Sequence, residues 1–106
     1  MPIGEPVPVL EVDDVQLELE AHRVRVAGRA VPLPAQEMRL LSVLMERAGH
    51  VLTRRELLDL AWGPGYPDHN KTLEVHIRRL RVKLDTPGCP SRIRTVFRLG
   101  YIFDVS

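Results

Sequence analysis

Residues 71–84 carry the pattern that most constrains the fold of this chain. At about 100° per residue in an α-helix, Leu73, Ile77, Leu80 and Leu84 fall within one narrow sector, which is the spacing of a stripe that packs on a core. The opposite sector collects basic and small apolar side chains: Lys71, Val75, Arg78, Arg79 and Val82. The flanks hold Thr72, Glu74, His76, Arg81 and Lys83. The sequence therefore predicts a helix with one apolar side and one cationic side.

The cationic side of this helix has two interpretations, an ordinary solvated surface or a surface that meets a polyanion. A solvated face usually interleaves acids with bases to gain i, i+4 pairs, yet Glu74 is the one acid within residues 71–84. Unpaired like charges repel one another unless an anion neutralises them, and this favours the polyanion.

The charge distribution along the whole chain points the same way. The net charge is only +1, from 15 Lys and Arg residues against 14 Asp and Glu residues. Residues 1–70 hold 7 basic and 11 acidic residues, a net charge of −4, whereas residues 71–106 hold 8 and 3, a net charge of +5. Asymmetry of this kind predicts that the C-terminal part contacts a polyanion.

Length and composition predict one small domain. A chain of 106 residues with 44% hydrophobic residues can bury one core. The single cysteine, Cys89, cannot form an internal disulfide, and its turn-like surroundings predict a passive loop residue. No signal-like segment and no apolar run near the roughly 20 residues of a membrane span is evident, so we expect a cytoplasmic protein without a membrane partner. The four histidines form no ligand cluster with the cysteine, and we expect no metal or cofactor.

The N-terminal third predicts strands. Residues 1–8 are rich in proline and predict a linker or disordered tail, so the domain is expected to span residues 9–106. Polar and apolar residues then alternate with period two, interrupted by turn-like residues. This alternation predicts four antiparallel strands within residues 10–12, 15–19, 23–26 and 29–33.

Helices follow, and a hairpin ends the chain. A first helix should begin near Ala35, with Gly49 as its left-handed C-cap. Thr53 and Glu56 have the spacing of a capping box, which predicts a second helix that stops at residues 62–64. Asp68 or Asn70 can cap the third helix. Alternation in residues 92–96 and 101–103 predicts the C-terminal hairpin.

The predicted order is that of an α+β winged helix-turn-helix: a four-stranded antiparallel sheet, three helices, and residues 93–103 as the wing. Five sequence blocks support it: Leu33-x-x-x-Glu37-x-x-Leu40-Leu41, the run 49–58, Ala61-Trp-Gly63, the run 71–84, and Thr95-Val-x-x-x-Gly-Tyr101. With these blocks the chain, from about residue 9 to 103, resembles the DNA-binding effector domain of OmpR/PhoB-type response regulators of two-component systems.

The resemblance implies sequence-specific binding of double-stranded DNA in transcription regulation, without enzyme activity, through the third helix in the major groove. It assigns base contacts to Arg79, Val75, Thr72 and Glu74. The chemistry agrees, since an arginine can bond guanine O6 and N7, a valine can touch a thymine methyl group, and a glutamate can accept from a cytosine amino group.

The resemblance assigns contacts with DNA phosphates to a further set: Lys71, His76, Arg78, Arg81, Arg54, Trp62 and Thr95. Such contacts supply affinity and salt dependence rather than sequence reading. Three of these residues have a structural alternative. Trp62 can be a half-buried core residue, Arg54 can simply complete a helical turn, and His76 can be a solvated flank.

The chain departs from the family pattern at two places. Pro34 stands where a capping Thr is usual, although its ring suits a helix entry. In the wing, Phe97 and Arg98 replace an Arg-Gly pair whose arginine reaches the minor groove. Arg98 can take over from the next position, while loss of the glycine can reshape the hairpin because a bulky residue with positive φ carries strain.

The resemblance also implies partners. It predicts pairing on direct DNA repeats and contact with RNA polymerase through the loop 63–69, for which a plain connector is the alternative. A different class of function stays open: a winged-helix protein-interaction module, or a regulatory appendage of a larger, possibly enzymatic protein, whose basic face meets an acidic partner.

Overall fold

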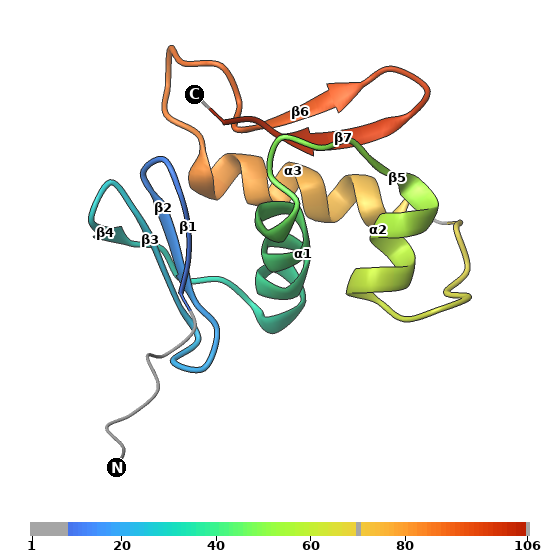
Figure 1. Cartoon of the computed structure of the whole chain (residues 1–106), viewed down its shortest axis with the longest axis horizontal. Coiled ribbons are helices and arrows are strands. Elements are labelled where there is room, and N and C mark those ends of the chain that lie inside the picture. Colours follow the sequence, from blue (N-terminus) through green and yellow to red (C-terminus); the bar gives the residue numbers. More distant parts are fainter. Residues whose placement is uncertain (1–8, 70, 106) are drawn as a thin grey trace.

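The computed structural model describes residues 9–69 and 71–105. Its elements, in chain order, are β1 (Val9–Val12), β2 (Val15–Glu18), β3 (Arg23–Val26), β4 (Arg29–Ala30), α1 (Ala35–Glu46), β5 (Leu52–Thr53), α2 (Arg54–Ala61), α3 (Thr72–Leu84), β6 (Ile93–Val96) and β7 (Gly100–Phe103). The helices lie between a four-stranded sheet and the C-terminal hairpin (Figure 1). This order confirms the predicted winged helix-turn-helix, while the predicted tail, residues 1–8, lies outside the described residues.

The N-terminal sheet has the strand order β1-β2-β3-β4, and all its neighbours are antiparallel. Alternate residues of β2 and β3 are buried, namely Val15, Leu17, Val24 and Val26, so one face of the sheet packs on the core. The fourth strand is shorter than predicted. After Ala30 the chain keeps a hydrogen bond from Val31 N to Val24 O of 2.9 Å, but it leaves the ladder and turns toward α1.

The first two helices begin where the sequence predicts. Pro34 precedes α1 in an extended conformation without a side-chain cap. Gly49 is not the C-cap of α1, because the helix ends at Glu46 and Arg47 takes the cap position; Gly49, with φ of 85°, instead donates its N–H to Phe103 O at 2.8 Å. The capping box of α2 is confirmed, with Glu56 N to Thr53 Oγ1 at 3.1 Å and Thr53 N to Glu56 Oε1 at 2.8 Å.

The start of α3 differs from the prediction. The N-cap residue is Lys71, which has a left-handed φ of 54° and makes no side-chain cap. Asp68 does not cap this helix, since its carboxylate instead accepts hydrogen bonds from Arg54 of α2. The other predicted cap, Asn70, lies outside the described residues.

The C-terminal hairpin belongs to a second sheet, ordered β5-β7-β6. Strand β5 was not predicted, because two residues carry no alternation. Gly100 allows the pairing: a Cβ at this position would lie 1.9 Å from the carbonyl oxygen of Leu52 in β5. The sheet therefore fixes the hairpin to the start of α2.

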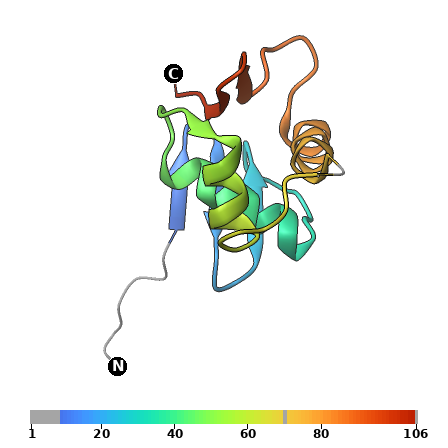
Figure 2. The same cartoon turned by 90° about the vertical axis from the view of Figure 1, so that its right-hand side faces the viewer.

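Leucines of all three helices complete the core, and several of them are fully buried: Leu40, Leu41, Leu44, Leu57, Leu73, Leu80 and Leu84. Figure 2 shows α3 nearly along its axis, at the edge of the molecule, with one side turned away from the other elements. Within residues 9–69 and 71–105, no helix is long and apolar enough to cross a membrane, and no group of three His, Cys, Asp or Glu side chains is placed to hold a metal ion.

Candidate nucleic-acid interface

Helix α3 separates its side chains as the sequence predicts. The stripe of Leu73, Ile77, Leu80 and Leu84 is buried against the core. On the other side Val82 is 78% exposed, and Lys71, Val75, Arg78 and Arg79 are also exposed. The cationic face of α3 is therefore turned to solvent.

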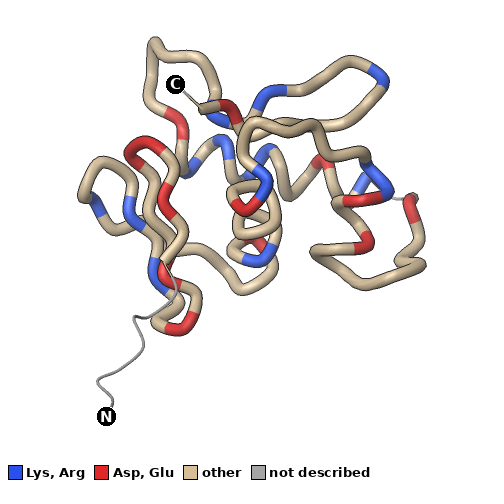
Figure 3. The backbone as a smooth tube through the Cα atoms, in the orientation of Figure 1, with Lys and Arg blue, Asp and Glu red and all other residues tan. Residues whose placement is uncertain are grey.

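The exposed basic side chains of α3 are not neutralised within the protein. Among the residues that the structure describes, the side chains of Lys71, Arg78 and Arg79 have no partner for a hydrogen bond or an ion pair. Figure 3 shows Lys and Arg positions along α3 and the neighbouring hairpin, whereas the N-terminal sheet and its turns carry both acidic and basic positions. Unpaired positive charge on one rigid element is the electrostatic footprint of a polyanion-binding surface.

Arg81 faces the hairpin rather than the open side of α3. Its Nε and Nη2 atoms donate to the carbonyl oxygen of Ile93 at 2.9 and 2.7 Å, and Nη2 also donates to Thr95 Oγ1 at 2.8 Å. The guanidinium carbon lies 5.8 Å from the centre of the Tyr101 ring. Two predicted phosphate contacts, Arg81 and Thr95, are thus bonded to each other and hold β6 beside α3.

Lys83, on the other flank, is a structural residue. Its Nζ lies 2.5 Å from Oε1 of Glu37, a residue of α1 that is only 3% exposed. A buried carboxylate requires such a partner, because desolvation without one is costly. This pair leaves Lys83 out of the free cationic face and ties α3 to α1.

Arg54 lies at the centre of an ionic cluster. Its Nε donates to Asp68 Oδ2 at 3.2 Å, Nη2 pairs with Asp68 Oδ1, and Nη1 pairs with Glu74 Oε2. The hydrogen bond from Arg54 lowers the pKa of Asp68 below its ordinary value of 3.8. Among the described residues, the second carboxylate oxygen of Glu74 is buried without a hydrogen-bond partner. Arg54 thus links α2, the loop before α3 and the first turn of α3.

This cluster bears on two predicted site residues and on one that sequence reasoning missed. Arg54 is predicted to contact phosphate and Glu74 to contact a base, and the two side chains form an ion pair with each other. For Asp68 the sequence predicts only a role as a helix cap. Its position in the loop next to the basic helix was a sequence signal for an ion pair, but the partner is 14 residues away and no local spacing identifies it.

Trp62 and His76 also come together. Their ring centres are 5.0 Å apart in an edge-to-face arrangement, and Tyr66 lies 6.0 Å from Trp62. Trp62 is half-buried and packs on the core, which agrees with the structural alternative for this residue. His76 Nδ1 lies 2.8 Å from the carbonyl oxygen of Thr72, so its ring is held in place beside α3.

The hairpin keeps a tight turn despite the missing glycine. Leu99 N donates to Val96 O at 2.9 Å, and Arg98 adopts the positive φ, 64°, that the third residue of a type II turn requires. Phe97 is 79% exposed, and the guanidinium carbon of Arg98 lies 5.1 Å from the centre of its ring. The turn therefore closes with Arg98, a residue with a bulky side chain, in the left-handed conformation that usually favours glycine.

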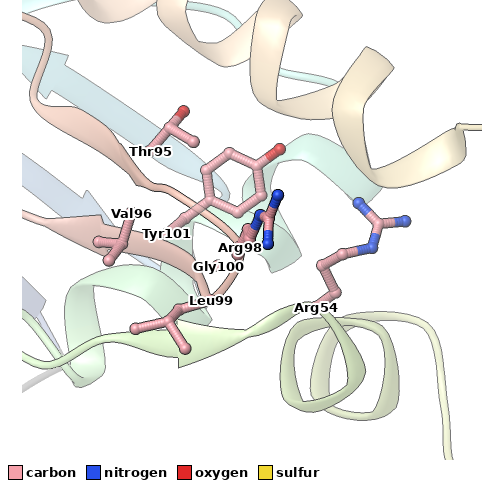
Figure 4. A pocket seen from close by; sticks show the side chains of 7 residues that line it. All are labelled: Arg54, Thr95, Val96, Arg98, Leu99, Gly100 and Tyr101. Carbon is pink, nitrogen blue, oxygen red and sulfur yellow. The ribbon is translucent and has the colours of Figure 1, made fainter.

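A hollow of about 150 Å³ lies at the foot of the hairpin. It is lined by Arg54, Thr95, Val96, Arg98, Leu99, Gly100 and Tyr101. Figure 4 shows Arg54, at the start of α2, and Arg98 and Tyr101, from the hairpin, among the side chains that line this hollow. Arg98 and Arg54 give this hollow donors for an anion, and of the two Arg54 is already paired with Asp68 and Glu74.

Comparison with known proteins gives a consistent result. The family model described as "Transcriptional regulatory protein, C terminal" matches residues 28–103. Sensory transduction protein RegX3 from Mycolicibacterium smegmatis is 45% identical over 94 residues, which is 88% of this chain and 41% of the relative. Phosphate regulon transcriptional regulatory protein PhoB from Rhizobium meliloti is 41% identical over 93 residues, with the same coverage. The chain thus spans less than half the length of these relatives.

Solved structures agree over nearly the whole chain. The Klebsiella pneumoniae RstA DNA-binding domain in complex with the RstA box superposes with a TM-score of 0.80 at 30% identity, covering 91% of this chain and 96% of that one. The DNA-binding domain of CpxR from E. coli gives a TM-score of 0.79 at 28% identity, covering 92% and 97%. The chain therefore belongs to the OmpR/PhoB-type family of C-terminal domains of transcriptional regulatory proteins.

Proposed function

We propose that this domain binds double-stranded DNA sequence-specifically to regulate transcription, with α3 in the major groove and the β6–β7 hairpin as a wing. The observation that carries the proposal is the open face of α3, where Lys71, Arg78 and Arg79 lack internal partners among the described residues. An α-helix fits the major groove, and arginines can read guanine there. The RstA domain, which has a similar fold, is described in complex with its DNA box, and this supports the proposal.

Arg79 is the first candidate for base reading, since it is exposed on the central turn of α3 and free to fork onto guanine. Val75, one turn earlier, offers methyl groups for a thymine, and Thr72 offers a hydroxyl group. Glu74 can accept from a cytosine only after it releases Arg54. A DNA phosphate that takes the place of Glu74 on Arg54 would free both residues for the assigned contacts.

The proposed phosphate contacts fall into three groups. Lys71 and Arg78 are free to approach the backbone directly. Arg81 and Thr95 act mainly by holding the wing, so their contribution to phosphate binding is secondary. Trp62 offers its indole N–H and His76 its free ring nitrogen, from a pair of rings fixed beside α3.

The loop 63–69 is proposed to contact RNA polymerase, and two domains are proposed to pair on direct repeats. Arg55 Nη2 donates to Tyr66 O at 2.7 Å, and Gly65 N donates to Asp59 Oδ1 at 3.2 Å. These bonds, with the Arg54–Asp68 pair, give the loop a defined shape, which favours a partner surface over a plain connector. We propose binding rather than catalysis, by a unit of residues 9–106 that acts in the cytoplasm.

The test is a binding titration with a duplex that the domain selects from a random library and with an unselected duplex, at several salt concentrations. We expect affinity to fall steeply with salt, and Arg78→Gln to lower the slope of log K against log salt by about one unit. Arg79→Gln should instead reduce the ratio between the affinity for the selected duplex and the affinity for the unselected duplex. If the domain selects no sequence, or if its affinity for DNA does not change with salt concentration, the proposal is contradicted and a protein-interaction module is favoured.

A further inference from the structure

The tip of the hairpin exposes an apolar surface that the core does not use. Phe97 is 79% exposed and Leu99 is 58% exposed, on either side of Arg98. Single exposed apolar residues are common, but an aromatic ring at the end of a protruding turn is well placed to contact a binding partner. Phe97 does not line the hollow at the foot of the hairpin, whereas Arg98 and Leu99 do.

The tip has a fixed position relative to α3. The fork from Arg81 to Ile93 O holds β6 to the helix, and the close approach of Gly100 to Leu52 holds β7 to β5. A residue on such a supported turn is presented at a defined distance from the basic face of α3. Phe97 is therefore placed by the fold and not by a free loop.

The hollow at the foot of the hairpin is lined by residues of the turn and of α2. Arg54 and Arg98 both line it (Figure 4). Arg54 also forms an ion pair with Glu74 in the first turn of α3. On a DNA duplex, the feature next to the major groove is one phosphate strand, and the minor groove follows it. A strand lying over Arg54 and Arg98 would bring the minor groove to Phe97.

We propose that Phe97 enters this minor groove as an apolar wedge that partly unstacks one base step, while Arg98 holds the adjacent phosphate strand. The proposal rests on the proposed DNA-binding function and adds a way of reading sequence. Phe97 has no hydrogen-bonding group for base edges, but apolar side chains in the minor groove open base steps and bend the duplex. Because pyrimidine–purine steps open most easily, the site should favour TA or CA at that position.

The experiment uses a duplex selected by the domain from a random library, with 2-aminopurine in place of single adenines across the site. Fluorescence of 2-aminopurine rises when its neighbours unstack, and anisotropy of an end label reports binding in the same sample. The variants are Phe97→Ala, Phe97→Leu and the control Leu60→Ala, which removes a 45% exposed leucine from α2.

We expect the unsubstituted domain to raise the 2-aminopurine fluorescence at one base step, next to the segment of the duplex that α3 covers. Phe97→Ala should lose this rise and bind about tenfold more weakly, the order expected for loss of one aromatic contact with a base. Phe97→Leu should keep part of the rise, and Leu60→Ala all of it. Thermal unfolding should be unchanged in Phe97→Ala, because the side chain is 79% exposed.

Three results would overturn the wedge. A rise that persists in Phe97→Ala, or no rise at any step while the duplex is bound, contradicts it and leaves the proposed DNA binding intact. A Phe97→Ala variant that changes only self-association in sedimentation assigns the ring to a second copy of the chain. Failure to select any duplex contradicts both the wedge and the proposed function.

Discussion

Arg81 of α3 donates two hydrogen bonds to one acceptor, the carbonyl oxygen of Ile93 at the start of β6. These bonds join the helix proposed to enter the major groove to the hairpin proposed to enter the minor groove. Arg81→Gln should lower the free energy of unfolding by about 1–3 kcal/mol, the range for losing a charged donor to a partly buried acceptor. Chemical denaturation of the unsubstituted domain and of the Arg81→Gln variant measures this difference in unfolding free energy.

The matched control for Arg81 is Arg78, an arginine of the same helix with no partner among the described residues. Arg78→Gln should change the unfolding free energy by less than about 0.5 kcal/mol. Equal losses in the two variants would show that the fork to Ile93 contributes nothing specific to the fold.

The pair of Lys83 and Glu37 predicts that its loss changes the stability of the domain and not its affinity for DNA. Lys83→Met leaves the buried Glu37 carboxylate unpaired and should destabilise the domain by about 2 kcal/mol, less than a fully buried pair because Lys83 keeps some contact with water. The double variant Glu37→Met, Lys83→Met should recover most of this loss. A double-mutant cycle in chemical denaturation measures it, and additive losses would contradict the pairing.

Gly100 predicts a steric effect on the wing. In Gly100→Ala the new methyl group meets the carbonyl oxygen of Leu52, so β5 and β7 must separate. We expect a loss of at least about 2 kcal/mol in unfolding free energy, in the range of overpacked sites. Hydrogen exchange at the backbone amides of β5 and β7 should accelerate. Unchanged exchange there would contradict the close approach.

Several elements were predictable because local pattern decides them. Thr53 and Glu56 define the start of α2 by their spacing, and the apolar stripe of α3 fixes which side it buries. Strand β5 was not predictable, since its two residues owe their conformation to pairing with Gly100 and Tyr101, nearly 50 residues away.

The candidate site was predictable only in part, for the same reason. A helical wheel places Arg81 and Lys83 on the flanks, but their partners, Ile93 and Glu37, lie on other elements. The wheel therefore identifies which side chains point away from the core, such as Arg79, but it cannot identify which basic side chains are bonded to other elements.

The Arg54–Asp68 pair predicts a titration. Because the hydrogen bond from Arg54 lowers the pKa of Asp68 below 3.8, the folded state binds this proton less readily than the unfolded state does. The contribution of Asp68 to stability is therefore present above the unfolded pKa and is lost as pH falls through the lower folded value. A carboxyl NMR titration should place the Asp68 midpoint below 3.8.

Arg54→Gln serves as the control for this titration. It should return the pKa of Asp68 toward its ordinary value, while Asp104, whose pKa is lowered by Arg94, should keep its midpoint. An Asp68 midpoint that is ordinary in both proteins would contradict the pair.

The central claim is that the open face of α3 is the surface that meets DNA, and backbone NMR tests it most directly. Adding a selected duplex to the labelled domain should shift amide signals of residues 71–82, with smaller shifts at residues 97 and 98 and little change in strands β1 to β4. The result that would contradict the claim is a set of shifts confined to the N-terminal sheet, with the signals of Arg78 and Arg79 unmoved at saturating duplex.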